Sequence, residues 1–259
     1  MSLPVRQTIR RRATKGFTLV ELAVVMAIVG LLLGGMMYTL SAVTERRGWD
    51  DTQRRLDYAR ELLLSFAIVN GRLPCPASSS VSGDESPVGG GACTNPYNGF
   101  LPAKAIGFQP VTATGAAVDA WGNPIRYVVS ITTWGTGTLA RFTKKHDSTL
   151  TSAAWSLSQS PSDLVVCSVS PATVTATTCD TNTSLVNLNT VVVIVFSTGK
   201  NGATGGTGTN EARNLDNNAL FVSRTPDPAD ATGGEFDDLM VWIPVGQLYG
   251  RLIAAGVLP

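Results

Sequence analysis

The fold is decided by the segment of residues 15–40, which reads Lys15-Gly16-Phe17-Thr18-Leu19-Val20-Glu21 and continues as LAVVMAIVGLLLGGMMYTL. From Phe17 onward the segment is apolar except for one carboxylate and two threonines. Twenty-four residues of helix, at about 1.5 Å per residue, extend about 36 Å, which is enough to cross a bilayer core about 30 Å thick. The pattern predicts that residues 17–40 form a membrane-spanning helix.

Charge is distributed unevenly around this segment. The chain of 259 residues carries 20 Lys and Arg against 19 Asp and Glu. Five of the bases and none of the acids precede residue 17, so the remaining chain has a net charge near −4. The basic side is therefore expected in the cytoplasm and the rest of the chain across the membrane. A nearly neutral chain offers no broad basic surface, and no nucleic-acid partner is expected.

Glu21 needs an explanation, because a carboxylate inside an apolar span costs about 2.5 to 3.5 kcal/mol on insertion scales. One interpretation is a tolerated acid near the helix end that reaches the lipid headgroups. The other is a counter-ion for a cation supplied by another subunit. A protonated amine created by proteolysis at Phe17 fits that role.

Residues 15–21 resemble the class III signal of type IV pilins and type II secretion pseudopilins, in which a basic leader ends in Gly before an aromatic residue and a Glu at the fifth position. The resemblance implies that prepilin peptidase cleaves between Gly16 and Phe17 and N-methylates the new terminus. It also implies that Glu21 pairs with the Phe17 amine of a neighbouring subunit during filament assembly. The implied partners are other pilin or pseudopilin subunits, in a homo- or hetero-filament. The implied location is the bacterial inner membrane, crossed once with the carboxy-terminal head in the periplasm, and then a periplasmic or extracellular filament.

The rest of the chain predicts a helix followed by a head. A leader would cover residues 1–16 and the membrane or filament-core helix residues 17–40. An amphipathic continuation is expected over residues 41–70, because apolar residues recur at spacings of three and four at Leu56, Ala59, Leu63, Phe66 and Ala67. Asn70 and Gly71 supply a helix stop. The head would then cover residues 71–259.

Within the head, residues 77–120 are rich in Ser, Gly, Pro and Ala and are expected to form an irregular variable loop. Short β-branched or aromatic runs bounded by turn residues follow at residues 125–133, 139–143, 164–169, 191–197, 219–223 and 239–243. The lengths of these runs and the turn residues between them are typical of antiparallel strands. The expected fold class is α+β and pilin-like, with a long amino-terminal helix packed on an antiparallel sheet.

Four cysteines lie in the predicted head, and three pairings are possible. Adjacent pairing, Cys75 with Cys93 and Cys167 with Cys179, would close two loops and is the arrangement we expect in an oxidising periplasm. Four unpaired buried thiols are the alternative. No C-x-x-C pair is present, which argues against structural zinc.

No catalytic constellation is recognisable, because the single histidine has no nucleophile elbow near it. The chain is therefore not expected to be an enzyme. Residues 119–127, DAWGNPIRY, are expected to form a tight corner in which Trp121 and Tyr127 cover the core. The same segment resembles one found in the major pseudopilins of type II secretion systems.

A glycine-dense loop follows the strand at residues 191–197. It resembles the calcium-binding loop of the same major pseudopilins, and by that resemblance the Thr198 carbonyl and the Asn201 side chain would be Ca²⁺ ligands. Asn201 stands where the family has Asp, which should weaken the site, and Glu211 and Asp216 are candidate replacements. The alternative is a flexible loop without metal. A nearby acidic group, Glu235, Asp237 and Asp238, is interpreted as a solvated turn before the last strand.

The sequence thus predicts a non-enzymatic structural subunit, a minor pilin or pseudopilin of a type IV filament system. The sequence does not decide whether the filament is a secretion pseudopilus or a type IV pilus. It also does not decide whether the subunit is major or minor, or what the head binds. No cofactor is certain, and Ca²⁺ is a candidate. The rival is a membrane-anchored periplasmic binding or adhesion domain that never polymerises.

Overall fold

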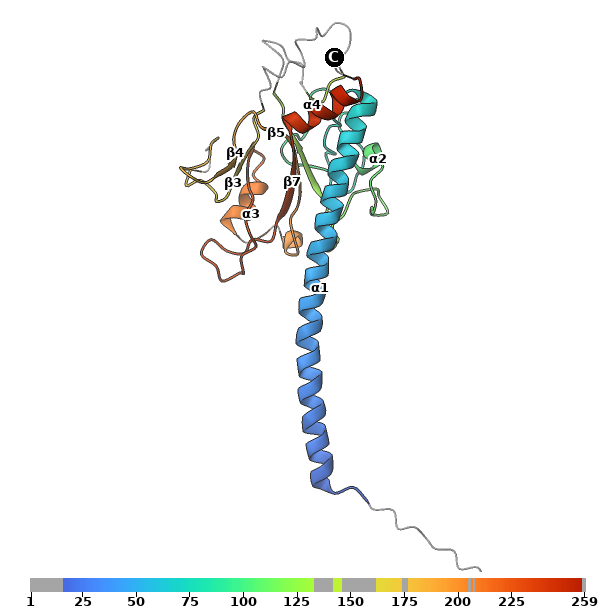
Figure 1. Cartoon of the computed structure of the whole chain (residues 1–259), viewed down its shortest axis with the longest axis vertical. Helices are drawn as coiled ribbons and strands as arrows, with labels where there is room; N and C mark the ends of the chain where they lie inside the picture. Colours follow the sequence, from blue (N-terminus) through green and yellow to red (C-terminus); the bar gives the residue numbers. More distant parts are fainter. Residues whose placement is uncertain are drawn as a thin grey trace, which may run out of the picture. The chain divides into compact units, whose positions relative to one another are not determined.

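The computed structural model describes residues 16–132, 142–145, 162–173, 177–204, 206 and 208–257, and within the first helix it does not describe the side chains of residues 35–42. Figure 1 labels most of the elements, which follow in chain order as α1 (Leu19–Asn70), β1 (Gly99–Phe100), α2 (Ala103–Ile106), β2 (Arg126–Val129), β3 (Val165–Cys167), β4 (Ser184–Val186), β5 (Val191–Ser197), the 3₁₀ turn η2 (Gly202–Thr204), α3 (Thr209–Asn214), β6 (Leu220–Val222), β7 (Leu239–Pro244) and α4 (Val245–Ala254).

The chain divides into two units, Met1–Arg47 and Gly48–Pro259, and α1 contributes to both. In the first unit the helix begins at Leu19, two residues after Phe17. A membrane crossing over residues 17–40 is not confirmed, because no helix in the described part of the chain is both long and apolar enough to cross a membrane. The expected leader lies, apart from Gly16, outside the described residues.

In the second unit, the predicted amphipathic stripe of α1 packs into the main core. Leu56, Ala59, Leu63 and Ala67 are buried there, and Phe66 is partly buried against the same cluster. The helix ends where the sequence predicted, since Gly71 has a φ of +65° and its N–H donates to the Ala67 carbonyl at 2.9 Å. This end of the helix therefore forms as its local sequence dictates.

The first sheet has the strand order β1-β2-β5-β7, and all its pairs are antiparallel, as expected. One face carries Tyr127, Val193 and Val195 into the core that α1 shares. The opposite face carries Ile194 and Phe196 into a second core. Because β5 is covered on both faces, its sequence VVVIVFS is apolar from Val191 to Phe196 rather than alternating.

The second sheet, in the order β4-β3-β6, supplies that second core through Leu164, Val166 and Phe221. Its pair β3–β6 is parallel, with Val165 opposite Leu220 and Cys167 opposite Val222. The expectation of a purely antiparallel head is therefore wrong for this pair. The reason is that β4, β5 and α3 intervene between β3 and β6, and a crossover of that length permits a parallel return.

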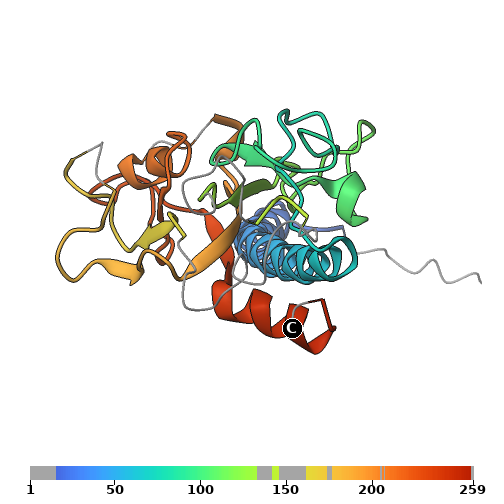
Figure 2. The ribbon, with the colours of Figure 1, turned by 90° about the horizontal axis from the view of Figure 1, so that it is seen from above.

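Two further elements of the head differ from those predicted. The predicted strand at 139–143 is a turn at residues 142–143, and residues 139–141 lie outside the described ranges. The sequence reading also missed α4, whose residues Val245, Leu248, Tyr249 and Leu252 are buried on one side. Figure 2 shows α4 beside the Gly48–Asn70 part of α1, and Arg251 of α4 pairs with Glu61 at 3.1 Å.

Disulfides are present as predicted. Cys75 is bonded to Cys93, and Cys167 is bonded to Cys179, and no described cysteine is free. The first bond closes a loop after α1, and the second closes a loop after β3. A closed loop has fewer unfolded conformations, so each bond stabilises the folded head.

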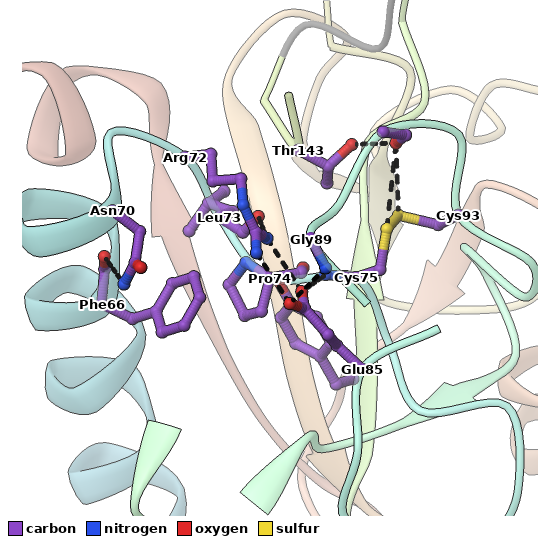
Figure 3. A network of polar contacts seen from close by, with 12 residues as sticks. Phe66, Asn70, Arg72, Leu73, Pro74, Cys75, Glu85, Gly89, Cys93 and Thr143 are labelled. Carbon is purple, nitrogen blue, oxygen red and sulfur yellow. Dashed lines mark hydrogen bonds and ion pairs between the residues drawn. A yellow bond between two sulfur atoms is a disulfide. The ribbon is translucent and has the colours of Figure 1, made fainter. Parts of the chain in front are cut away.

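A buried ion pair fixes the loop beside the first disulfide (Figure 3). The Arg72 guanidinium donates to Glu85 Oε2 at 2.8 Å and to Glu85 Oε1 at 2.7 Å, and it lies 5.2 Å from the centroid of the Phe66 ring. The Glu85 carboxylate also accepts from the N–H groups of Cys75 (3.2 Å) and Gly89 (2.9 Å). The pair thus joins the end of α1 to the variable loop.

We expect Glu85→Ala to lower the free energy of unfolding by about 3 to 5 kcal/mol, because it leaves the Arg72 guanidinium buried without its counter-ion. The matched control is Asp84→Ala, which removes an exposed pair with Lys104 and should lower the free energy of unfolding much less than Glu85→Ala does. Urea unfolding of the detergent-solubilised chain, followed by circular dichroism, measures both. Equal losses in the two variants would contradict this role for the buried pair.

Candidate functional site

The predicted processing site lies directly before α1. Residues 16–18 are not helical, and Glu21 stands in the first turn of the helix. The Thr18 N–H and hydroxyl both donate to Glu21 Oε2, at 2.9 and 2.8 Å, and the Glu21 N–H donates back to Thr18 Oγ1 at 3.2 Å. This reciprocal pattern is a capping box, which satisfies N–H groups that the start of a helix leaves without partners.

The side chains around this capping box are exposed. Phe17 is 86% exposed, Glu21 is exposed, and so are the large apolar side chains Leu19, Val20, Leu22, Val24, Val25, Met26, Ile28, Val29, Leu31, Leu32 and Leu33. An apolar helical surface of this extent is unfavourable in water and marks a region that contacts protein or lipid. The charge of Glu21 therefore sits at the start of a surface suited to association.

A second candidate site lies in the head, where three carboxylates converge. Glu211 is in the first turn of α3, and Asp237 and Asp238 immediately precede β7. One carboxylate oxygen from each lies within 4.8 Å of the others, and all three residues are buried. The Asp237 N–H donates to Glu211 Oε1 at 2.9 Å, which holds these two residues against each other.

The glycine loop approaches this acidic cluster (Glu211, Asp237 and Asp238) from the end of β5. The Asn201 amide nitrogen Nδ2 lies 3.2 Å from each oxygen of Glu211, and the Asn201 N–H donates to Asp237 Oδ2 at 3.1 Å. A Cβ added at Gly199 would lie 2.1 Å from Asp237 Oδ1, and one added at Gly206 would lie 2.4 Å from Glu211 Oε2. Glycine is thus required at both positions for the loop to reach the carboxylates.

Burial raises the pKa of two of these acids. Removal from water raises the pKa of Asp238 to about 8, although its hydrogen bond from Asn214 Nδ2 at 2.6 Å acts in the opposite direction. Burial also raises the pKa of Asp237, and the neighbouring charge of Glu211 contributes to the increase. Both shifts arise mainly from burial, which disfavours the charged form of a carboxylate.

The donor set fits a hard divalent cation. Ca²⁺ binds carboxylate and amide oxygens, and the cluster offers three carboxylates and one amide within a compact space. Asn201 Oδ1 and Asp237 Oδ1 are buried, and among the described residues neither accepts a hydrogen bond. A half-turn of the Asn201 amide would direct its oxygen toward Glu211, so the side chain suits either a cation or a bare carboxylate as its neighbour.

The structure brings together some of the predicted ligands and not others. Asn201 and Glu211 meet in the cluster, and Thr198 lies at the start of the loop with its carbonyl role still a prediction. Asp216 does not join them, because it pairs with Arg213 at 2.9 Å and accepts from Asn218. Sequence reading assigned it by proximity along the chain.

Asp237 and Asp238 are 6% and 7% exposed, so the prediction of a solvated turn at these residues is wrong. A signal for their role was present in the sequence. The glycine loop follows β5, the two acids precede β7, and antiparallel pairing places Ser197 opposite Leu239. The end of one strand and the start of the other must then lie side by side.

Comparison with known families adds one finding, a match of residues 11–37 to the prokaryotic N-terminal methylation motif. Neither the curated proteins nor the solved structures give a significant match to the chain. The matched range contains Gly16, Phe17 and Glu21, together with the exposed apolar surface described above. The chain therefore carries the amino-terminal signal of type IV pilins and pseudopilins.

Proposed function

We propose that this protein is a structural subunit, a minor pilin or pseudopilin, of a type IV filament system. The observation that carries the proposal is the methylation motif at residues 11–37, which implies processing by prepilin peptidase and pilin-family assembly. Cleavage between Gly16 and Phe17 would place a new amine four residues before Glu21, in the first turn of α1. The subunit needs no catalytic chemistry for this role.

Assembly would use the exposed apolar surface of the first unit. In a filament, the apolar side chains of residues 17–34 would pack against the same segment of neighbouring subunits and leave lipid or water. The Glu21 carboxylate would accept the methylated amine of a neighbour's Phe17. Thr18 already orients this carboxylate through Oε2, so its position at the helix start is set before a neighbour arrives.

Before assembly, the proposed location of the subunit is the inner membrane, with the head in the periplasm. The signal and the basic residues before Phe17 support this location, and the two disulfides of the head suit an oxidising compartment. The rival function is a membrane-anchored binding or adhesion domain. It differs in one measurable respect, because such a domain needs neither cleavage nor methylation at Phe17.

A second proposal concerns the head, where Glu211, Asp237, Asp238 and Asn201 would hold a Ca²⁺ ion. The convergence of three buried carboxylates supports it, and so do the buried oxygens Asn201 Oδ1 and Asp237 Oδ1, which accept no hydrogen bond from the described residues. The ion would supply two positive charges and bring the ends of β5 and β7 together. Its role would be structural.

Glu21→Ala should leave leader cleavage intact and abolish incorporation into filaments, because the neighbour's amine loses its counter-ion. Pull-out of sheared filaments and immunoblotting of the membrane and filament fractions measure the outcome. Glu45→Ala serves as control, since Glu45 is an exposed acid in the same helix outside the motif. Normal incorporation of the Glu21 variant would refute the assembly role.

Gly16→Leu should block processing, because a bulky side chain replaces the residue at the cleaved bond. The membrane fraction would then contain a precursor heavier than the wild-type protein by the leader. Mass spectrometry of the wild-type amino terminus should show N-methyl-Phe17. An intact Met1 in the wild type would instead favour the binding or adhesion domain.

Saturating Ca²⁺ should raise the melting temperature of the metal-stripped chain by roughly 5 to 10 °C, given about 2.7 kcal/mol at a hundredfold excess over Kd. Glu211→Gln should remove most of this shift. Asp216→Asn, which alters an acid of the same segment outside the cluster, should retain it. If the melting temperature of the wild type does not change with Ca²⁺, the metal site is excluded.

A further inference from the structure

Residues 119–123, here called the corner, form a closed turn around a buried carboxylate. Asp119 is 2% exposed, and its Oδ1 accepts from the N–H groups of Trp121 (2.9 Å) and Asn123 (2.8 Å). The Asp119 N–H donates to the Asn123 carbonyl at 2.9 Å, and Gly122 takes a φ of +88°. These bonds make the corner rigid and leave the second carboxylate oxygen, Oδ2, for another element.

That second oxygen holds the glycine loop. Asp119 Oδ2 accepts from Ser197 Oγ at 2.6 Å, and Ser197 Oγ in turn accepts from the Gly199 N–H at 3.1 Å. The Gly199 carbonyl accepts from Asn123 Nδ2 at 2.7 Å. Both polar groups of Gly199 are therefore fixed by the corner, one through Ser197 and one directly.

Gly199 also lies close to Asp237. Its Cα approaches so closely that an added Cβ would lie 2.1 Å from Asp237 Oδ1, and its φ of +63° suits glycine. Two residues later the Asn201 N–H donates to Asp237 Oδ2. A displacement of Gly199 would thus move the groups that contact both oxygens of Asp237.

The corner is bound on its other side to α1, within the same unit. Arg55 Nη1 donates to the carbonyls of Val118 (3.0 Å) and Asp119 (2.7 Å), and the Ala120 N–H donates to Thr52 Oγ1 at 3.1 Å. Trp121 packs edge-on against Trp49 of the helix, with 5.9 Å between the ring centroids. Polar bonds and an aromatic contact therefore join the corner to residues 49–55.

We infer that the corner is a relay between the acidic cluster and α1. Ser197 and Asn123 position Gly199 for cation binding. When a cation occupies the acidic cluster, the corner transmits its effect to the contacts with Trp49, Thr52 and Arg55 of the helix. The inference rests on the proposed Ca²⁺ site. Ser197 and Asn123 are positioning residues, since they act on the cation through Gly199 and Asp237. A cation that fixes Asp237 would limit the motion of Gly199 and so of the corner, which stiffens the base of the helix in the head.

The test uses the full chain in detergent micelles, with CaCl₂ as the probe. Ser197→Ala should weaken Ca²⁺ affinity about tenfold by isothermal titration, because the Gly199 N–H loses its acceptor. In hydrogen–deuterium exchange, Ca²⁺ should protect residues 118–123 and 49–56 of the wild type, and this protection should disappear in the variant. Asn123→Ala, which removes the second bond to Gly199, should act in the same direction and serves if the first variant does not fold.

Ser162→Ala is the matched control. Ser162 is also buried, and its hydroxyl donates to the Val191 carbonyl at the opposite end of β5. It should destabilise the fold and leave Ca²⁺ affinity unchanged. Unaltered affinity and protection in the Ser197 and Asn123 variants would overturn the relay while the metal site stands. Absence of Ca²⁺ binding in the wild type would overturn both, and the titration alone separates these two cases.

Discussion

The head depends on the burial of β5 on both faces. Val193 and Val195 face the core shared with α1, and Ile194 and Phe196 face the core shared with the second sheet. All seven residues of β5 are buried, and each large apolar side chain removed from water contributes about 1.5 to 3 kcal/mol. The helix α1 shares the core on one face of β5, and the second sheet shares the core on the other face.

The position of β5 determines which residues its carboxyl end meets. The strand ends in Ser197 opposite Leu239 of β7, so the glycine loop that follows it meets the acids that precede β7. Burial then removes these acids from water and raises the pKa of Asp238 and Asp237. Burial of three carboxylates around one point disfavours their charged forms, and a bound cation would offset that cost.

Features specified by local sequence were predictable. The signal around Gly16 and Phe17 is a short contiguous pattern, and Asn70 with Gly71 ends the helix through backbone conformation alone. The parallel β3–β6 pair and the burial of Asp237 and Asp238 were not, because both arise from contacts between distant segments. Asp216 lies outside the acidic cluster for the same reason, because closeness along the chain does not fix closeness in space.

The two candidate sites use carboxylates in opposite ways. Glu21 is exposed and held by Thr18, so it is accessible to the cation that a neighbouring subunit would bring. Asp237 and Asp238 are buried, which raises the pKa of both and disfavours their charged forms, and the proposed Ca²⁺ would offset this cost. An exposed acid suits association between subunits, because its partner must enter from outside. A buried acid suits the completion of a fold, because its partner must be enclosed, and the corner at Asp119 joins that enclosed charge to the helix through which subunits would associate.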